Sequence, residues 1–202
     1  MIHDIGVRWD SGEITQQKYV DIEKPKNIKN KRYIIDNVIP ETMFGCIEKY
    51  ITGMDINWNY QQGTVNEGDS DWRFSNVVYH SKSGFKSNKY AQFSPIFDFL
   101  HAQTLISVKL NCDIHTQIPE QRQFHTDNSF YGDFSFTAIL YFNDCNGKTI
   151  FEDGAEIQSK RNRMIVFNSS ERHAGVTQTD VPRRHLMNIN YLANAMPVGE
   201  EF

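Results

Sequence analysis

The chain has 202 residues, which suits one globular domain with a full-sized core and a small N-terminal extension. Hydrophobic residues make up 39% and aromatic residues 13% of the sequence, which excludes disorder throughout the chain. The formal net charge of −4 argues against a nucleic-acid binder that relies on bulk positive charge.

Targeting and redox features favour the cytoplasm. No apolar run approaches the length that spans a bilayer, and residues 1–4 lack the charged-then-apolar pattern of a secretory signal. Cys46, Cys112 and Cys145 are scattered and form no CxxC pair, so we expect reduced thiols that pack in the core. The sequence therefore predicts a cytoplasmic protein that is not secreted and has no membrane partner.

The N-terminal part, residues 1–32, is polar and ends in a basic stretch at 24–32. We expect a short strand followed by a solvated linker, because charge runs usually face solvent. A basic contact with nucleic acid is the alternative.

Residues 33–104 form an expected helical support region. The pattern predicts a strand over 33–39, closed by Pro40, and a helix over 41–51 with apolar residues at helical spacing. A loop rich in Trp, Asn and Gly is expected over 58–75. Ser94 and Pro95 can start a second helix over 93–103.

Strands dominate the rest of the chain. Apolar stretches at 105–112, 134–142, 163–167 and 185–192 are separated by Gly, Asn and Asp clusters. Helices followed by antiparallel strands favour a mainly β (α+β) sandwich or barrel, backed by the N-terminal helices. We expect 105–192 to be its core, 193–202 to be a tail, and the whole chain to be one domain.

A candidate metal site lies in this strand-rich half. His125 and Asp127 stand two residues apart, so in an extended chain they project from the same face. A second histidine, His173, follows 46 positions after Asp127 (173 − 127). Two histidines and one carboxylate can occupy one face of an iron ion and leave the opposite positions open. An HxD pair also occurs by chance, and a surface histidine in a polar loop is the plainer interpretation of His173.

Five sequence blocks support a metal site, because together they are more specific than any one motif. In chain order they are HTDN at 125–128, TAILYFN at 137–143, NGKTIF at 146–151, NRMIVF at 162–167 before His173, and RRHLMNINY at 183–191. The region that they span, about 105–192, resembles the prolyl-4-hydroxylase-like group of 2-oxoglutarate and Fe(II)-dependent oxygenases, including forms encoded by bacteriophages. Two positions depart from the family pattern: Asn146 replaces a glycine and Phe142 a leucine.

This resemblance implies a double-stranded β-helix (jelly-roll) core and a dioxygenase. The cofactors would be Fe(II), held by His125, Asp127 and His173, together with 2-oxoglutarate and O2 as co-substrates. The implied reaction hydroxylates a substrate C–H bond and releases succinate and CO2. The presence of Asp127 argues against the related halogenases, which have a small residue at that position. If the chain is phage-encoded, the implied location is the cytoplasm of the host cell.

The resemblance also implies an arginine at the head of the last strand, which would bind the distal carboxylate of 2-oxoglutarate. Arg183 and Arg184 follow His173 by 10 (183 − 173) and 11 (184 − 173) positions, and both spacings fit the family. Register favours Arg184, because Met187, Ile189 and Tyr191 then share the opposite face. Tyr141 is expected to contact the same carboxylate. Asn111 and Asn188 are further candidates for the pocket, because buried amides need partners.

Two other functions remain open from sequence. A cupin-like metal-binding jelly roll without oxygenase activity would explain the histidines and strands, but it needs no arginine on the last strand. A structural, phage-associated domain is the second alternative. The substrate is undetermined: a protein side chain, a nucleotide and a small metabolite all fit. The loops expected to shape specificity are 57–92, with Trp58, Tyr60, Trp72 and Tyr79, and 116–122.

Overall fold

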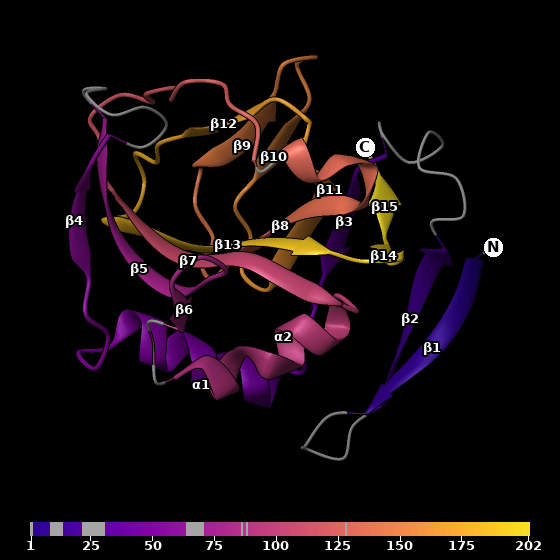
Figure 1. The fold of residues 1–202 in the computed structure, drawn as a ribbon. Coiled ribbons are helices and arrows are strands. Elements are labelled where there is room, and N and C mark those ends of the chain that lie inside the picture. Colours follow the sequence, from indigo (N-terminus) through magenta and orange to yellow (C-terminus); the bar gives the residue numbers. More distant parts are fainter. Residues whose placement is uncertain are drawn as a thin grey trace.

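The computed structural model describes residues 2–8, 14–21, 31–63, 71–85, 87, 89–127 and 129–202. Within these residues the chain is mainly β, with strands arranged in antiparallel sheets and two α-helices on one side (Figure 1). This architecture confirms the predicted jelly roll backed by helices.

The largest sheet forms the centre of the molecule. Its strands follow the order β15-β3-β11-β8-β13-β7-β5-β4, and β6 also pairs with β5. Their bounds are β3 Tyr33–Asp36, β4 Asn59–Gln62, β5 Trp72–His80, β6 Gly84–Phe85, β7 Thr104–Ile114, β8 Ser135–Tyr141, β11 Arg163–Asn168, β13 Arg183–Leu192 and β15 Glu200–Glu201. The four strands predicted from 105 onward correspond to β7, β8, β11 and β13.

A smaller sheet lies against the inner face of the large one. It contains β10 Glu156–Gln158, β9 Lys148–Phe151 and β12 His173–Val176, in that order. Phe151 and Ile157 from this sheet pack in one buried cluster with Ile139, Tyr141 and Leu186 of the large sheet. The two sheets therefore enclose the interior of the jelly roll, and in Figure 1 the helices lie on the other side of the large sheet.

The helices cover the outer face. Helix α1 (Glu41–Thr52) buries Phe44, Ile47 and Ile51, which recur at helical spacing, and it confirms the helix predicted over 41–51. Helix α2 is shorter than predicted: it spans Ser94–Phe99 after a 3₁₀ turn at Tyr90–Phe93. It ends where His101 adopts a positive φ of 49°, a conformation that stops a helix. No helix in the described part of the chain has the length and apolar character needed to cross a bilayer.

Residues 58–75 correct the predicted loop, because 59–62 and 72–75 belong to β4 and β5. The period-2 pattern of β5 is obscured for two physical reasons. Its register against β7 shifts between Val77 and Tyr79, and its inner positions carry the polar residues Arg73 and Ser75. Residues 64–70 of this predicted loop lie outside the described residues.

Both chain ends contribute strands. Strands β1 (Ile2–Arg8) and β2 (Ile14–Asp21) pair with each other, and β2 pairs with β14 (Ala195–Val198). The predicted tail at 193–202 contains β14 and β15, and the extension holds two strands where one was expected. Most of the predicted basic linker, residues 22–30, lies outside the described residues. At its end, Arg32 forms ion pairs with Asp153 (2.8 Å) and Glu171 (2.9 Å).

Candidate active site

The structure brings the three predicted metal ligands together. His125 and His173 face each other across a short antiparallel bridge, with mutual backbone hydrogen bonds of 3.0 Å. Nε2 of His125 lies 3.8 Å from Oδ1 of Asp127, and Nε2 of His173 lies 3.9 Å from Oδ2 of Asp127. All three donor atoms lie within 4.8 Å of one another. This set of donors fits the two-histidine, one-carboxylate pattern typical of non-haem iron.

Both imidazoles are oriented for metal binding by their own backbone. Nδ1 of His125 lies 3.2 Å from the carbonyl oxygen of Gln123, and Nδ1 of His173 lies 3.1 Å from that of Glu171. A carbonyl can only accept, so each Nδ1 carries the proton and each Nε2 presents a lone pair. Burial lowers the pKa of His173, which keeps its ring neutral near pH 7.

A chain of hydroxyl groups holds Asp127. Thr137 Oγ1 donates to Asp127 Oδ2 at 3.1 Å, and Asn190 Nδ2 donates to the same oxygen at 3.0 Å. Because the Thr137 proton is committed to Asp127, the Ser169 hydroxyl donates to Thr137 (3.1 Å), and Ser135 in turn donates to Ser169 (3.1 Å). Such partners orient a ligating carboxylate. Sequence reasoning missed Thr137 and Asn190 as site residues, although both occupy inner positions of strands that it predicted.

The two candidate arginines occupy opposite environments. Arg184 is 1% exposed, whereas Arg183 lies on the surface. Met187 and Ile189 pack in the core beneath the helices, while Leu186 belongs to the interior cluster, so Arg184 lies on the interior face as the register predicted. Among the described residues, Nε and Nη2 of Arg184 have no partner with hydrogen-bond geometry. Buried donors of this kind are costly unless a ligand satisfies them.

Tyr141 and Thr149 lie beside this arginine. The Tyr141 ring is fully buried, with its centroid 5.3 Å from the guanidinium carbon of Arg184. Its hydroxyl donates to Thr149 Oγ1 at 2.8 Å, and burial raises the pKa of Tyr141, which keeps it a donor. Thr149 was not singled out from sequence, although it belongs to one of the five blocks. Since Tyr141 donates its proton to Thr149, the Arg184 guanidinium and the Thr149 hydroxyl form a group of donors suited to one carboxylate.

The two predicted pocket amides also lie on the interior face. Asn111 pairs with Leu186 across the sheet, and Asn188 pairs with Ile139, and both of these partners belong to the interior cluster. The side-chain oxygens of both asparagines are buried without a hydrogen-bond partner in the described residues. They leave acceptors available to a ligand.

A cluster of cations around Asp113 was not predicted from sequence. Arg122 contacts the Asp113 carboxylate at 2.9 Å, Arg73 at 3.7 Å and Arg184 at 3.8 Å. Burial alone would raise the pKa of Asp113, but the three guanidinium groups hold that pKa below its ordinary value. These residues come from four separated segments, so no local sequence signal reveals the cluster.

Lys109 lies on the same face of β7 as Asp113. The pKa of Lys109 is lowered to about 8, chiefly by burial and also by the nearby Arg73 and Arg122, whereas the negative charge of Asp127 acts in the opposite direction. Strand register places Lys109 opposite Asn188, two positions from the Asn190 that donates to Asp127.

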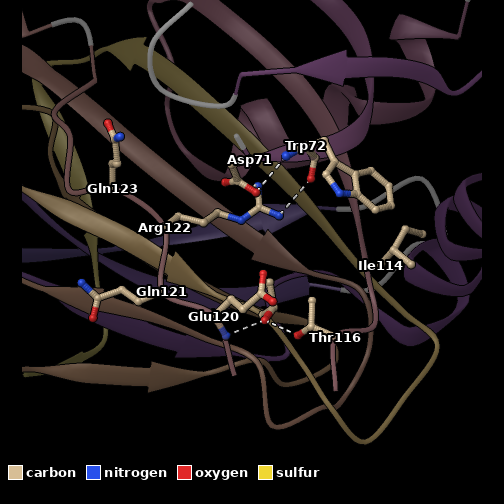
Figure 2. A pocket seen from close by; sticks show the side chains of 9 residues that line it. Asp71, Trp72, Ile114, Thr116, Glu120, Gln121, Arg122 and Gln123 are labelled. Atoms are coloured by element: carbon tan, nitrogen blue, oxygen red, sulfur yellow. Dashed lines mark hydrogen bonds and ion pairs between the residues drawn. The ribbon is translucent and has the colours of Figure 1, made fainter. Parts of the chain in front are cut away.

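A cavity of about 220 Å³ lies next to Arg122 (Figure 2). Four of its lining residues come from the loop 116–122 that was expected to shape specificity: Thr116, Glu120, Gln121 and Arg122. Figure 2 shows Arg122 between Asp71, 3.2 Å away, and the backbone oxygen of Trp72, 3.5 Å away. None of the three candidate metal ligands lines this cavity.

The aromatic residues of the other expected specificity loop divide into two groups. The Trp58 ring is tilted against that of His185, with centroids 5.8 Å apart, and both Trp58 and Tyr79 pack against the core. Tyr60 and Trp72 are exposed and lie 6.1 Å apart. The second pair is the more exposed of the two and can contact a ligand.

Solved structures with the same fold include iron-dependent oxygenases. A prolyl hydroxylase from Trichoplax adhaerens, solved with a hypoxia-inducible-factor peptide, aligns with a TM-score of 0.57 and 15% identity over 81% of this chain and 84% of its own. A Pseudomonas putida prolyl-4-hydroxylase aligns with a TM-score of 0.53 and 13% identity, over 80% and 92%. The epimerase SnoN, solved with Fe3+ and alpha-ketoglutarate, gives 0.58 and 10%, over 84% and 82%.

No protein-family model matches the sequence, and no curated protein matches it. At identities this low the structural likeness establishes the fold alone. These neighbours include hydroxylases and an epimerase, so the fold does not specify the reaction. Evidence about the chemistry must therefore come from the site.

Proposed function

We propose that this protein is an Fe(II)- and 2-oxoglutarate-dependent dioxygenase that hydroxylates a C–H bond. His125, Asp127 and His173 would hold the iron. Arg184, Tyr141 and Thr149 would bind the distal carboxylate of 2-oxoglutarate. The observation that carries the proposal is the combination of three converging ligands with a buried guanidinium whose donors lack partners.

When bound, the iron and 2-oxoglutarate supply the oxidising chemistry, with succinate and CO2 as products. The protein's own groups bind and orient. The two carbonyl contacts fix each histidine with Nε2 free, and Thr137 and Asn190 hold one oxygen of Asp127. Because the Tyr141 phenol donates to Thr149, the Thr149 hydroxyl keeps its own proton for an acceptor. That hydroxyl and the Arg184 guanidinium are buried, and burial strengthens the hydrogen bonds that they would donate to a carboxylate.

The contacts of Arg184 favour an oxygenase over a cupin-like binding module. A module that binds only a metal needs no arginine buried beside a tyrosine and a threonine. It would also bear the desolvation cost of Nε and Nη2 of Arg184 without compensation. An incoming carboxylate offsets that cost with two parallel charged hydrogen bonds.

Anaerobic titration of the purified chain with ferrous iron and 2-oxoglutarate tests the proposal. We expect a weak visible metal-to-ligand charge-transfer band. His173→Ala should abolish it and Arg184→Ala should weaken it. Arg183→Ala is the matched control, because Arg183 lies on the surface one position away, and it should leave the band unchanged. If the wild-type chain gives no band, the proposed function is rejected; if Arg183→Ala is the damaging change, the assignment of Arg184 is wrong.

A further inference from the structure

Among the described residues, the interior near the candidate metal site carries more cations than anions. Apart from the candidate ligand Asp127, two described carboxylates lie among the basic side chains of this region: Asp71 and Asp113. The basic side chains number four: Arg73, Lys109, Arg122 and Arg184. Burying like charges together is unfavourable unless anions compensate. The distal carboxylate of 2-oxoglutarate supplies one further anion, so one positive charge remains in excess.

Arg122 and Arg184 are already accounted for. Arg122 lies between two carboxylates, 2.9 Å from Asp113 and 3.2 Å from Asp71. Arg184 belongs to the proposed co-substrate site. The uncompensated charge therefore lies with Arg73 and Lys109.

Contacts of these two side chains support that assignment. Arg73 reaches Asp113 only at 3.7 Å, and its Nε has no hydrogen-bond partner in the described residues, although its side chain is 15% exposed. Lys109 donates to the neutral side-chain oxygen of Gln61, and no described carboxylate lies within ion-pair distance of it. Both are desolvated cations with donor capacity left for an anion.

Strand register places the pair beside the reaction site. Lys109 pairs with Asn188 in β13, and Asn190, two positions further along that strand, donates to Asp127. Two residues in a strand span roughly 7 Å. The long Lys109 side chain therefore starts about one strand step from the residue that holds the metal carboxylate. Arg73 lies on the neighbouring strand β5 and reaches toward the same face through Asp113.

We propose that the substrate of this enzyme carries an anionic group, a carboxylate or a phosphate, which Lys109 and Arg73 bind on the interior face beside the metal. This inference rests on the proposed function, since it assumes that Arg184 is occupied by 2-oxoglutarate. A planar guanidinium and a compact ammonium can share one anion through several charged hydrogen bonds. The lowered pKa of Lys109 agrees with a site that lacks its anion, because an arriving anion favours the charged amine.

The test measures binding, so that it does not depend on turnover. The chain is loaded with Mn(II) and saturating 2-oxoglutarate and titrated calorimetrically with inorganic phosphate or, separately, with acetate. We expect one of these anions to bind at a single site. Lys109→Met and Arg73→Met should each weaken that binding by about tenfold or more, as expected for the loss of a charged hydrogen bond. Lys109→Arg should restore most of it, and Arg183→Met, on the exposed surface, is the control that should change nothing.

Three results would overturn the inference. The loaded protein could bind neither anion, or the two methionine variants could leave anion binding unchanged, as for an anion that coordinates the metal directly. Alternatively, both variants could weaken 2-oxoglutarate as strongly as Arg184→Met does, which would assign the two cations to the co-substrate. If the wild-type chain does not bind 2-oxoglutarate at all, the proposed function itself fails. Should Lys109→Met not fold, Lys109→Gln and Lys109→Arg provide the same comparison. Binding of phosphate or of acetate identifies which class of anion the site accepts.

Discussion

Thr137→Val should weaken metal binding while the fold is retained. Valine has nearly the same shape as threonine, so the substitution removes one hydroxyl without opening a cavity. The lost bond is the 3.1 Å donation to Asp127 Oδ2. A hydrogen bond to a charged acceptor contributes about 1.5–3 kcal/mol. Since Asn190 still donates to the same oxygen, we expect the metal dissociation constant to rise about 10- to 100-fold, the range usual for partners of metal ligands.

Stability should also fall, for a separate reason. In the variant, the buried Ser169 hydroxyl loses its acceptor and Asn190 loses one of its two. An unsatisfied buried polar group costs about 1–3 kcal/mol. Thr177→Val is the matched control, because Thr177 is also buried, binds Thr116 and the Glu120 backbone, and is not among the candidate ligands or their partners. It should lose stability but keep the wild-type metal affinity.

The assay is calorimetric titration of the apoprotein with Mn(II) or, without oxygen, Fe(II), together with thermal denaturation of each variant. If Thr137→Val and Thr177→Val bind metal equally well, the hydroxyl chain does not position Asp127. The role assigned to it would then be wrong, whatever the change in stability.

Three further predictions follow from individual side chains. The pKa of His185 is lowered from the ordinary 6.5 to about 4, chiefly by burial, so between these pH values only the unfolded chain binds the proton and stability falls as the pH falls. In urea melts at pH 7 and pH 4, His185→Leu should remove roughly 3 kcal/mol of this loss of stability, and an unchanged difference between the two pH values would contradict the prediction. Gly147→Ala should weaken 2-oxoglutarate binding about fivefold or more by titration, because the added Cβ would lie 2.9 Å from Arg184 Cδ; wild-type affinity would place the co-substrate elsewhere. Arg32→Met should lower the unfolding free energy by about 2 kcal/mol, since Arg32 forms ion pairs with two carboxylates and its guanidinium carbon lies 4.1 Å from the centre of the Phe151 ring. An unchanged denaturation midpoint would show that these contacts contribute nothing to stability.

The sequence was informative wherever one local pattern decides the structure. Helix α1 follows from apolar spacing, and the four long strands follow from apolar runs between turns. The choice of Arg184 over Arg183 followed from register, because a shift of one residue would bury Arg183 and expose the core residues of β13. The observed burial of the two arginines agrees with that reasoning.

Features that depend on distant pairing could not be predicted. Strand β2 pairs with β14 near the other end of the chain, and no local pattern encodes such a partner. Strand β5 was taken for a loop because its polar interior positions resemble those of a solvent-facing segment. The cluster around Asp113 assembles residues 73, 113, 122 and 184, each of which has the ordinary appearance of a surface charge in the sequence.

The two faces of the large sheet explain why a stable domain can keep so many unsatisfied groups. On the outer face, Val108, Leu110, Met187 and Ile189 pack under the helices and are essentially buried, so this face supplies the hydrophobic stabilisation. The inner positions of the same strands are then free to hold polar side chains at a cost in stability. Unpaired atoms of Arg73, Asn111, Arg184 and Asn188 lie on that face. The desolvation free energy of these atoms is offset only when ligands bind to them. We therefore expect the chemistry on the interior face and not in the cavity beside Arg122.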